Sequence, residues 1–233
     1  MELGGATWPE VAATTNEFLL ALPVGSLEQH GPHLPLDTDT RIAVALAHRL
    51  ARTRPDIFVA PAVGYGASGE HAGFAGTLLI AHAVLADVLM ELVRSARGSF
   101  AGVVLVSTHG GNREGLSLVM ERCRVDGEAA LVWPAVVPGG DAHAGRTETS
   151  LMLAIDPAAV RLERAEAGNT DPLEALMPRL RAEGVRPISS NGVLGDPRGA
   201  SAAEGEALLS GLTADLADAV RARWPDAGLR PAP

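Results

Sequence analysis

The stretch EFLLALPVGSLEQHGPHLPLDTDTRIAVALAHRLART, residues 17–53, decides the fold class that we predict for this protein. Its first eight residues, EFLLALPV at 17–24, form a short apolar run that is typical of a buried strand. Residues 40–53 carry apolar side chains at helical spacing. The segment between them contains Gly and Pro, which favour a loop. We therefore predict a strand, a loop and a helix in that order.

The rest of the chain repeats this alternation of strands and helices. Further strands are predicted at 57–62, 102–107 and 129–136, and helices at 82–97, 113–125, 148–154, 172–183 and 202–222. Strands that alternate with helices favour a parallel sheet covered on both faces. We predict a three-layer α/β/α fold with a mainly parallel central sheet. A single domain would span 1–233, with an irregular lead-in at 1–16 and a loose tail at 225–233.

The composition excludes several classes of partner. The chain has 233 residues with 19 basic and 28 acidic side chains, a formal net charge of −9. Nucleic-acid binding needs a basic surface, so no nucleic acid is expected as a partner. The N-terminal residues lack a signal-peptide pattern, no apolar run is long enough to span a membrane, and Cys123 is the single cysteine. We expect a cytoplasmic protein that does not bind membranes.

The first polar cluster, GSLEQHGPHLPLDTD, follows the strand at 17–24 directly. Glu28 and His30 are two residues apart, so both side chains point to one side of an extended chain. Imidazole and carboxylate together suit zinc, iron or manganese. Asp39 is a further candidate ligand, although Asp37 or Asp39 could instead cap the next helix, an alternative that we favour only for Asp37. We expect His33 to support the ligands rather than to bind metal.

The second cluster, STHGGN, follows the strand at 102–107. His109 stands at the carboxyl end of that strand and is a candidate metal ligand. The two glycines after it allow the backbone to approach a ligand closely. Asn112 is a candidate substrate contact; alternatively, it hydrogen-bonds a metal ligand or caps the next helix. Because the carboxyl ends of parallel strands meet at one edge of a sheet, we expect His109 to lie near Glu28.

The third cluster, DAHAGRTETS at 141–150, follows the last predicted strand. Glu148 is a candidate metal ligand, and the alternative is a carboxylate that only favours the N-terminus of its helix. His143 is the candidate catalytic residue, because imidazole transfers protons near neutral pH. The alternative for His143 is a hydrogen bond that anchors the loop.

A glycine-rich loop, GYGASGEH at 64–71, contains the spacing GxGxxG. We reject a dinucleotide site there, because no helix is predicted to follow the glycines. Glu70 and His71 are instead candidate substrate-binding residues, with solvated loop positions as the alternative. Cys123 is not expected to be catalytic, since its helix offers no partner histidine.

Three segments resemble motifs of the creatininase (creatinine amidohydrolase) family: PVGSLEQHGPHLPLDTDT at 23–40, STHGGN at 107–112 and DAHAGRTETS at 141–150. The resemblance extends over roughly residues 17–222. It implies a hydrolase that acts on C–N amide or peptide bonds with divalent metal ions, two per subunit, of Zn, Fe or Mn. It also implies a homo-oligomer.

The resemblance further implies which residues hold the ions. Asp39 would bridge them, with Glu28 and His109 on one ion and His30 and Glu148 on the other. Gly111 stands where creatininase has a metal-binding Glu, which is why Glu148 is expected to take that role. Ala142 also stands where creatininase has a Glu. Both differences argue against creatinine as the substrate.

A branch of this family shares three further segments: YGASGEHAGFAGT at 65–77, GDAHAGRTETS at 140–150 and NGVLGDPRGASAAEGE at 191–206. The members of that branch are peptidases whose substrate is a small modified ribosomal peptide. The resemblance implies hydrolysis after a Gly, with release of a modified C-terminal Val-Tyr dipeptide. The alternative is an amidohydrolase or deformylase that acts on another small cyclic or formyl amide. A binding module without catalysis is a third hypothesis, which the complete ligand set disfavours.

Overall fold

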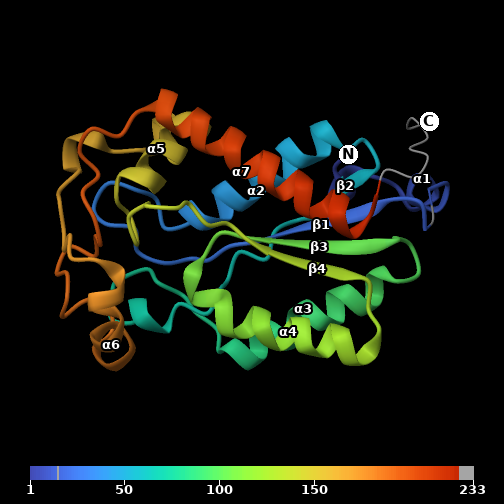
Figure 1. Ribbon diagram of the computed structural model, residues 1–233, viewed down its shortest axis with the longest axis horizontal. Coiled ribbons are helices and arrows are strands. Elements are labelled where there is room, and N and C mark those ends of the chain that lie inside the picture. Colours follow the sequence, from blue (N-terminus) through green and yellow to red (C-terminus); the bar gives the residue numbers. More distant parts are fainter. Residues whose placement is uncertain (15, 226–233) are drawn as a thin grey trace.

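The computed structural model describes residues 1–14 and 16–225, which are built around a four-stranded sheet (Figure 1). All neighbouring strands are parallel, in the order β2-β1-β3-β4. The strands are β1 (Leu19–Val24), β2 (Ile57–Val59), β3 (Gly102–Ser107) and β4 (Ala130–Pro134). The predicted α/β class with a parallel sheet is therefore confirmed.

Helices cover both faces of the sheet, as Figure 1 shows. One face carries α2 (Thr38–Thr53), α5 (Arg146–Ile155) and α7 (Ala202–Arg223), and the other carries α3 (His82–Ala96) and α4 (Arg113–Asp126). Two separate apolar clusters fill the spaces between the layers, one on each side of the sheet. These clusters confirm the three-layer α/β/α architecture.

The strand β1 shows why the sheet is buried on both faces. Leu19 and Ala21 belong to the cluster beneath α2 and α7, whereas Leu20 and Leu22 belong to the cluster beneath α3. Successive side chains of a strand point to opposite faces, so both sets must be apolar. A continuous apolar run is the result, and this is the pattern from which the strand was predicted.

The structure differs from the prediction at the N-terminus. Residues 1–16 were predicted to be irregular, but they contain a 3-10 turn at Leu3–Gly5 and a short helix, α1 (Trp8–Ala12). The backbone N–H and the hydroxyl of Thr7 both hydrogen-bond Glu10 Oε2, at 2.6 and 2.7 Å, which stabilises the first turn of α1. Of the predicted tail at 225–233, residues 226–233 lie outside the described residues.

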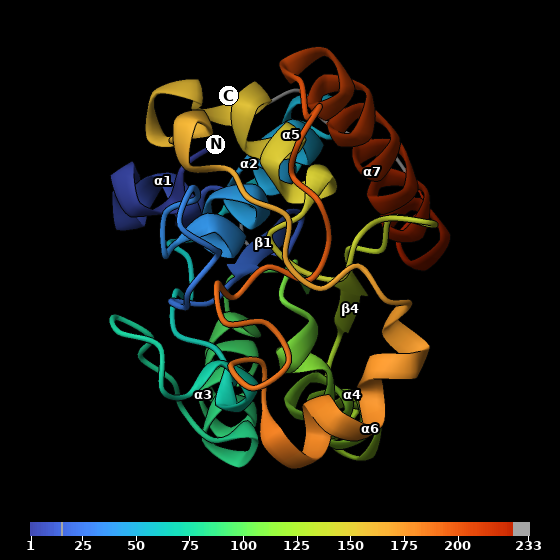
Figure 2. The same cartoon turned by 90° about the vertical axis from the view of Figure 1, so that its left-hand side faces the viewer.

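The carboxyl ends of β1 and β3 lie side by side at the point where the strand order changes direction. From β1 the chain passes through α2 to β2 on one side of β1, and from β2 it returns through α3 to β3 on the other side of β1. Parallel sheets form their ligand sites in the crevice at such a point. Figure 2 faces this end of the molecule, where long loops connect to α5 and to α6 (Leu173–Glu183).

In the described part of the chain, no helix has the length and apolarity needed to cross a membrane.

Candidate metal centre

Glu28 and His30 follow β1, and both side chains are fully buried. The N–H of Glu28 donates to Leu36 O at 2.9 Å, and this hydrogen bond joins the start and the end of the loop between β1 and α2. His30 Nδ1 lies 3.1 Å from Glu28 O. A carbonyl oxygen only accepts, so Nδ1 carries a proton, and Nε2 is the nitrogen that faces the interior and could bind a metal after losing its proton. A histidine that ligates a metal is oriented in this way.

Asp39 lies in the first turn of α2 and is 2% exposed. Its Oδ2 accepts a hydrogen bond from Ser26 Oγ at 2.6 Å. The same oxygen lies 3.6 Å from His30 Nε2 and 3.3 Å from His109 Nδ1. One carboxylate therefore stands between two imidazole rings, which is the position that a bridging ligand needs.

His109 follows β3 and brings the second cluster to the first. Its Nε2 lies 3.1 Å from Glu28 Oε2, while its Nδ1 faces Asp39. The hydroxyl of the preceding Thr108 donates to Asp39 O at 2.7 Å, which joins the end of β3 to the start of α2. The convergence predicted for Glu28 and His109 is therefore present in the structure.

Glu148 approaches the same centre from the first turn of α5. Its Oε2 lies 3.9 Å from His30 Nε2 and accepts a 2.6 Å hydrogen bond from the backbone N–H of Ala144. Ala144 has a φ of 51°, a conformation that costs a non-glycine residue ~1–2 kcal/mol. The side chain of Glu148 is 20% exposed, so the centre opens to solvent on this side.

The donor set suits a divalent cation. Three groups of side chains could each hold an ion: Glu28 with Asp39 and His109, His30 with His143 and Glu148, and Glu28 with His71 and His143. Both carboxylate oxygens of Glu28 and the Nε2 of His30 are buried, yet they lack hydrogen-bond partners among the described residues. Buried polar atoms are almost always satisfied. A metal ion would satisfy these atoms, so the residues fit the cofactor that the resemblance implies.

The electrostatics of the centre reflect its burial. Burial raises the pKa of Glu28 to about 7, although His109 opposes the shift. Burial alone would lower the pKa of His30 and of His109, but neighbouring carboxylates, Asp39 and Glu28 among them, raise each to about 10. The carboxylates therefore attract positive charge into a site from which water is largely excluded.

His143 lies over this centre, with its ring centroid 4.3 Å from those of both His30 and His71. Its Nε2 lies 2.8 Å from Gln29 O, so this nitrogen donates its proton to the backbone. Its Nδ1 then has a free lone pair, 3.8 Å from Glu28 Oε1. This arrangement suits a group that accepts a proton at Nδ1, and it equally suits a metal ligand.

His71 was expected to contact substrate, but it lies against the candidate metal ligands, 3.3 Å from Glu28. It is 3% exposed, and burial lowers its pKa to about 3, so the ring is neutral. Gln29 Nε2 donates to His71 Nδ1 at 2.8 Å. The proton of the neutral ring is therefore on Nε2, which lies 3.3 Å from Glu28 Oε1. In this tautomer the Nε2–H of His71 faces Glu28, at ion-pair distance.

Glu70 lies beside His71 and reaches toward Gly111. A methyl group added to Gly111 would overlap Glu70 Oε1 and His109 Nε2, and would lie 2.6 Å from Ala67 O. The glycine at this position thus lets the loop containing Glu70 pack against the imidazole of His109. The carboxylate of Glu70 is partly exposed at the rim of the centre, where a substrate could contact it.

The structure does not bring Asn112 to the cleft as predicted. The side chain is fully buried, its Oδ1 accepts from Ala67 N at 2.9 Å, and its Nδ2 donates to Gly25 O at 3.0 Å. The oxygen and the nitrogen of this amide therefore join three loops. Asp37 occupies the N-cap position of α2, but its carboxylate pairs with Arg41 at 2.7 Å instead of capping the helix.

Three supporting residues were missed or undervalued by sequence reasoning. Gln29 joins His71, His143 and the backbone, Ser26 donates to Asp39, and Ser68 Oγ lies 3.3 Å from His109 Nε2. Gln29 and Ser26 lie within the first polar cluster, so their closeness in sequence to Glu28 and His30 could have indicated a supporting role. His33 is fully buried, and its Nε2 lies 2.9 Å from Thr149 Oγ1, next to Glu148 in the chain.

An α/β/α fold with a cluster of carboxylates and imidazoles at the switch point of a parallel sheet defines a class of metal-dependent hydrolases. The sequence profile of the family described as creatininase, creatinine amidohydrolase, matches residues 5–220. The chain belongs to the creatininase family and is a hydrolase of amide bonds.

The similar proteins within the family include several with one shared name. The chain is 48% identical over 213 residues to the mycofactocin precursor peptide peptidase of Mycolicibacterium smegmatis, which covers 89% of this chain and 86% of the relative. It is 45% identical over 232 residues to the protein of the same name from Mycobacterium tuberculosis, covering 96% and 91%. A crystal structure of creatininase superposes with a TM-score of 0.76 at 28% identity, covering 97% and 98% of the two chains.

Proposed function

We propose that this protein is a metal-dependent peptidase that removes the modified C-terminal Val-Tyr dipeptide from the mycofactocin precursor peptide, by hydrolysis after a Gly. The observation that supports this proposal best is the convergence of Glu28, Asp39 and His109 in a buried cluster within a chain 45–48% identical to peptidases of that name. The substrate is carried over from these relatives, and the reaction is supported by the chemistry of the cluster.

We propose two metal ions per subunit. Glu28, Asp39 and His109 would hold one, and His30 and Glu148 would hold the second together with Asp39. Solved creatininase structures at 27–28% identity include a form described as Zn–Zn and another described as Mn, which supports ions of this kind. Iron is a further candidate, because the same ligands accept it. Bound ions would lower the pKa of a water molecule and polarise the amide carbonyl.

The chain's own residues would position the reaction and move its protons. Asp39 and Glu28 place negative charge at the centre, and Ser26 and His71 hold their carboxylates in position. His143 is assigned the proton transfer. Its Nδ1 would take a proton from the attacking water as the C–O bond forms, and would return that proton to the leaving nitrogen as the C–N bond breaks. Its other nitrogen stays hydrogen-bonded to the backbone, which keeps the ring oriented.

The test is incubation of metal-loaded protein with the modified precursor peptide, followed by mass spectrometry, with a chelated sample beside it. We expect release of the modified dipeptide only where metal is present. Asp39→Ala should lose metal and activity together. Asp37→Ala is the matched control, because Asp37 lies two residues away but pairs with Arg41 outside the centre. Full activity of Asp39→Ala would exclude the bridging role. Bound metal without cleavage would shift the substrate to a formamide or another small amide.

A further inference from the structure

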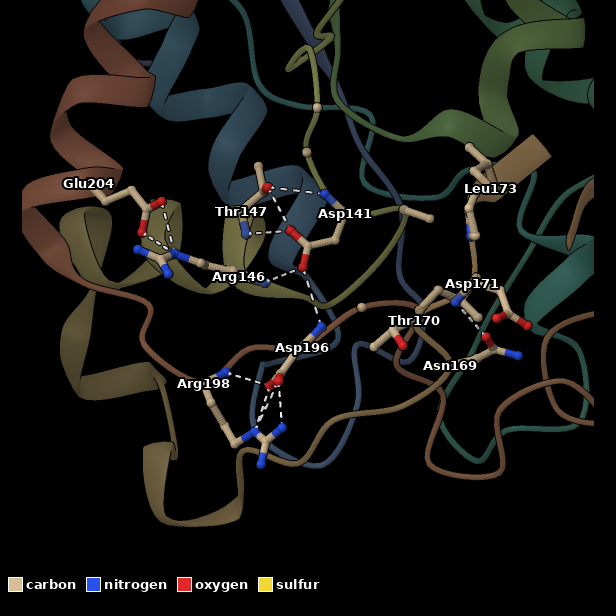
Figure 3. A pocket seen from close by; sticks show the side chains of 16 residues that line it. Asp141, Arg146, Thr147, Asn169, Thr170, Asp171, Leu173, Asp196, Arg198 and Glu204 are labelled. Carbon is tan, nitrogen blue, oxygen red and sulfur yellow. Dashed lines mark hydrogen bonds and ion pairs between the residues drawn. The ribbon is translucent and has the colours of Figure 1, made fainter. Parts of the chain in front are cut away.

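A polar hollow of about 590 Å³ lies beside the metal centre, between the N-terminal ends of α5 and α6 (Figure 3). It is distinct from the centre, since none of Glu28, His30, Asp39, His109 and Glu148 lines it. Its volume is in the range of ~300–1,000 Å³ that is usual for ligand sites. The lining carries four carboxylates and two guanidinium groups, and thus differs from the apolar pockets that bind compact small molecules.

The hollow and the metal centre share one wall. Asp141 and Ala142 face the hollow, whereas the next residue, His143, faces the centre. The wall is held by a short antiparallel bridge, in which His143 and Leu194 exchange backbone hydrogen bonds of 3.2 and 2.9 Å. On the other side, Thr147 lines the hollow and the adjacent Glu148 reaches the centre. The solvent-exposed side of the centre, at Glu148, therefore lies next to the hollow.

The hollow also offers hydrogen-bonding groups that the fold does not use. Arg146 pairs with Glu204 through Nε, and Arg198 pairs with Asp196 through Nε and Nη2. Figure 3 shows both guanidinium groups at the edge of the hollow. Among the described residues, no hydrogen-bond or ion-pair partner contacts either Nη group of Arg146 or the Nη1 of Arg198. The side-chain carboxylate of Asp171 has no such partner there either. These donors and this acceptor match the carbonyl and N–H groups of a peptide backbone.

We propose that this hollow binds the segment of the peptide substrate that precedes the scissile bond. The inference rests on the proposed function and names a second binding site for the same substrate. The released dipeptide is small and would be held at the buried centre. The segment before the scissile bond stays attached to the rest of the peptide, so its backbone needs an open surface with donors and acceptors. Arg198 and Asp171 would bind it on opposite sides of the hollow.

The experiment compares two substrates: the full precursor peptide and a tetrapeptide with the same four C-terminal residues. We expect the wild-type protein to cleave the full precursor with a higher kcat/KM, through a lower KM. In Arg198→Ala and in Asp171→Ala, the ratio of kcat/KM for the long substrate to that for the short one should fall about tenfold, as expected for one lost charge-assisted hydrogen bond. Arg181→Ala is the matched control, because Arg181 is exposed on α6 but does not line the hollow.

A second readout does not depend on turnover. A labelled precursor that lacks the final two residues should bind the wild-type protein in a fluorescence anisotropy titration, and about tenfold more weakly to Arg198→Ala. Cleavage of the tetrapeptide without any preference for the full precursor would overturn the second site and leave the peptidase function intact. Failure to cleave either substrate, with metal bound, would overturn both proposals. Unchanged ratios in both variants would also exclude the hollow as the binding site.

Discussion

At the scale of single residues, the metal centre depends on side chains that control one another's protons. Glu28 is the clearest case, because its buried carboxylate is approached by three imidazoles: His109 at 3.1 Å, His71 at 3.3 Å and His143 at 3.8 Å. A ligand in this position must be ionised to bind metal, but burial favours the neutral form. The imidazoles around Glu28 therefore decide how readily this carboxylate ionises and binds an ion.

Replacing His71 by Ala tests this dependence. The change removes the N–H that faces Glu28 Oε1, and we expect metal affinity to fall ~10–100-fold, the usual effect of losing such a supporting contact. Titration of the metal-free protein with zinc against a competing chelator measures it. His82→Ala is the control, since His82 is half-buried on α3 and faces Glu114 instead of Glu28. Equal affinities of the two variants would contradict the orienting role.

Gly111 and Gly110 form a second matched pair. A methyl group on Gly111 would meet His109, Glu70 and the backbone of Ala67, whereas one on Gly110 would meet nothing within 4 Å. We expect Gly111→Ala to lower the free energy of unfolding by ~1–3 kcal/mol through overpacking, and Gly110→Ala to change it by less than about 0.5 kcal/mol. Urea unfolding of both metal-loaded variants gives the comparison. Equal stabilities would show that the loop can move away from Gly111.

At the scale of elements, the start of α5 is held by one carboxylate. Asp141 accepts hydrogen bonds from Arg146 N at 2.8 Å, Thr147 N at 3.0 Å and Thr147 Oγ1 at 2.8 Å. Burial alone would raise the pKa of Asp141, but the N–H groups of Thr147 and Arg146 lower it. This carboxylate therefore fixes the first turn of the helix that presents Glu148 to the centre.

The lowered pKa of Asp141 predicts a pH dependence of stability. Its contribution is present above the pKa of an unfolded Asp, about 3.9, and is lost as the pH falls through the lower folded pKa. Asp141→Asn should cost ~1–2 kcal/mol at pH 7, a value reduced by the partial exposure of the group, and almost nothing at the most acidic pH where the protein stays folded. Asp218→Asn, on the exposed face of α7, is the control. A cost for Asp141→Asn that does not change with pH would contradict this account.

At the scale of the whole molecule, metal binding would link the sheet, α2 and α5 into one unit. The candidate ligands come from the loop after β1, the end of β3 and the first turns of two helices. An ion that binds only the folded chain stabilises it by mass action, so chelation should lower the melting temperature.

The homo-oligomer implied by the family resemblance stays a prediction, which light scattering of the metal-loaded protein would test.

Metal binding should also release protons. Before an ion binds, the pKa of His30 and that of His109 are about 10, so both rings are protonated at pH 7 and must become neutral to act as ligands. Metal affinity should therefore fall as the pH is lowered. Calorimetric titrations at pH 7 in buffers with different heats of ionisation measure the protons released. An apparent binding enthalpy that is the same in every buffer would contradict the predicted release of protons.

The sequence by itself determined the layers of the fold and the set of candidate ligands. Apolar runs at 17–24 and 102–107 must be buried on both faces, and the polar residues that follow each strand must then gather at one edge of the sheet. The spacing of Glu28 and His30, two residues apart, likewise indicated that both side chains point to the same side of the chain. Such properties depend on short-range periodicity and on the direction of parallel strands, both of which are visible in one dimension.

Only the tertiary structure decided the roles that depend on distant contacts. His71 is 43 residues from Glu28 in the chain, yet it orients that carboxylate, whereas Asn112 is held by loops rather than by a substrate. The packing of Glu70 against Gly111 and the hollow beside Asp141 also join segments that are far apart in the sequence. The tautomer of a histidine and the burial of an amide are set by the surrounding chain. No local pattern of residues specifies them.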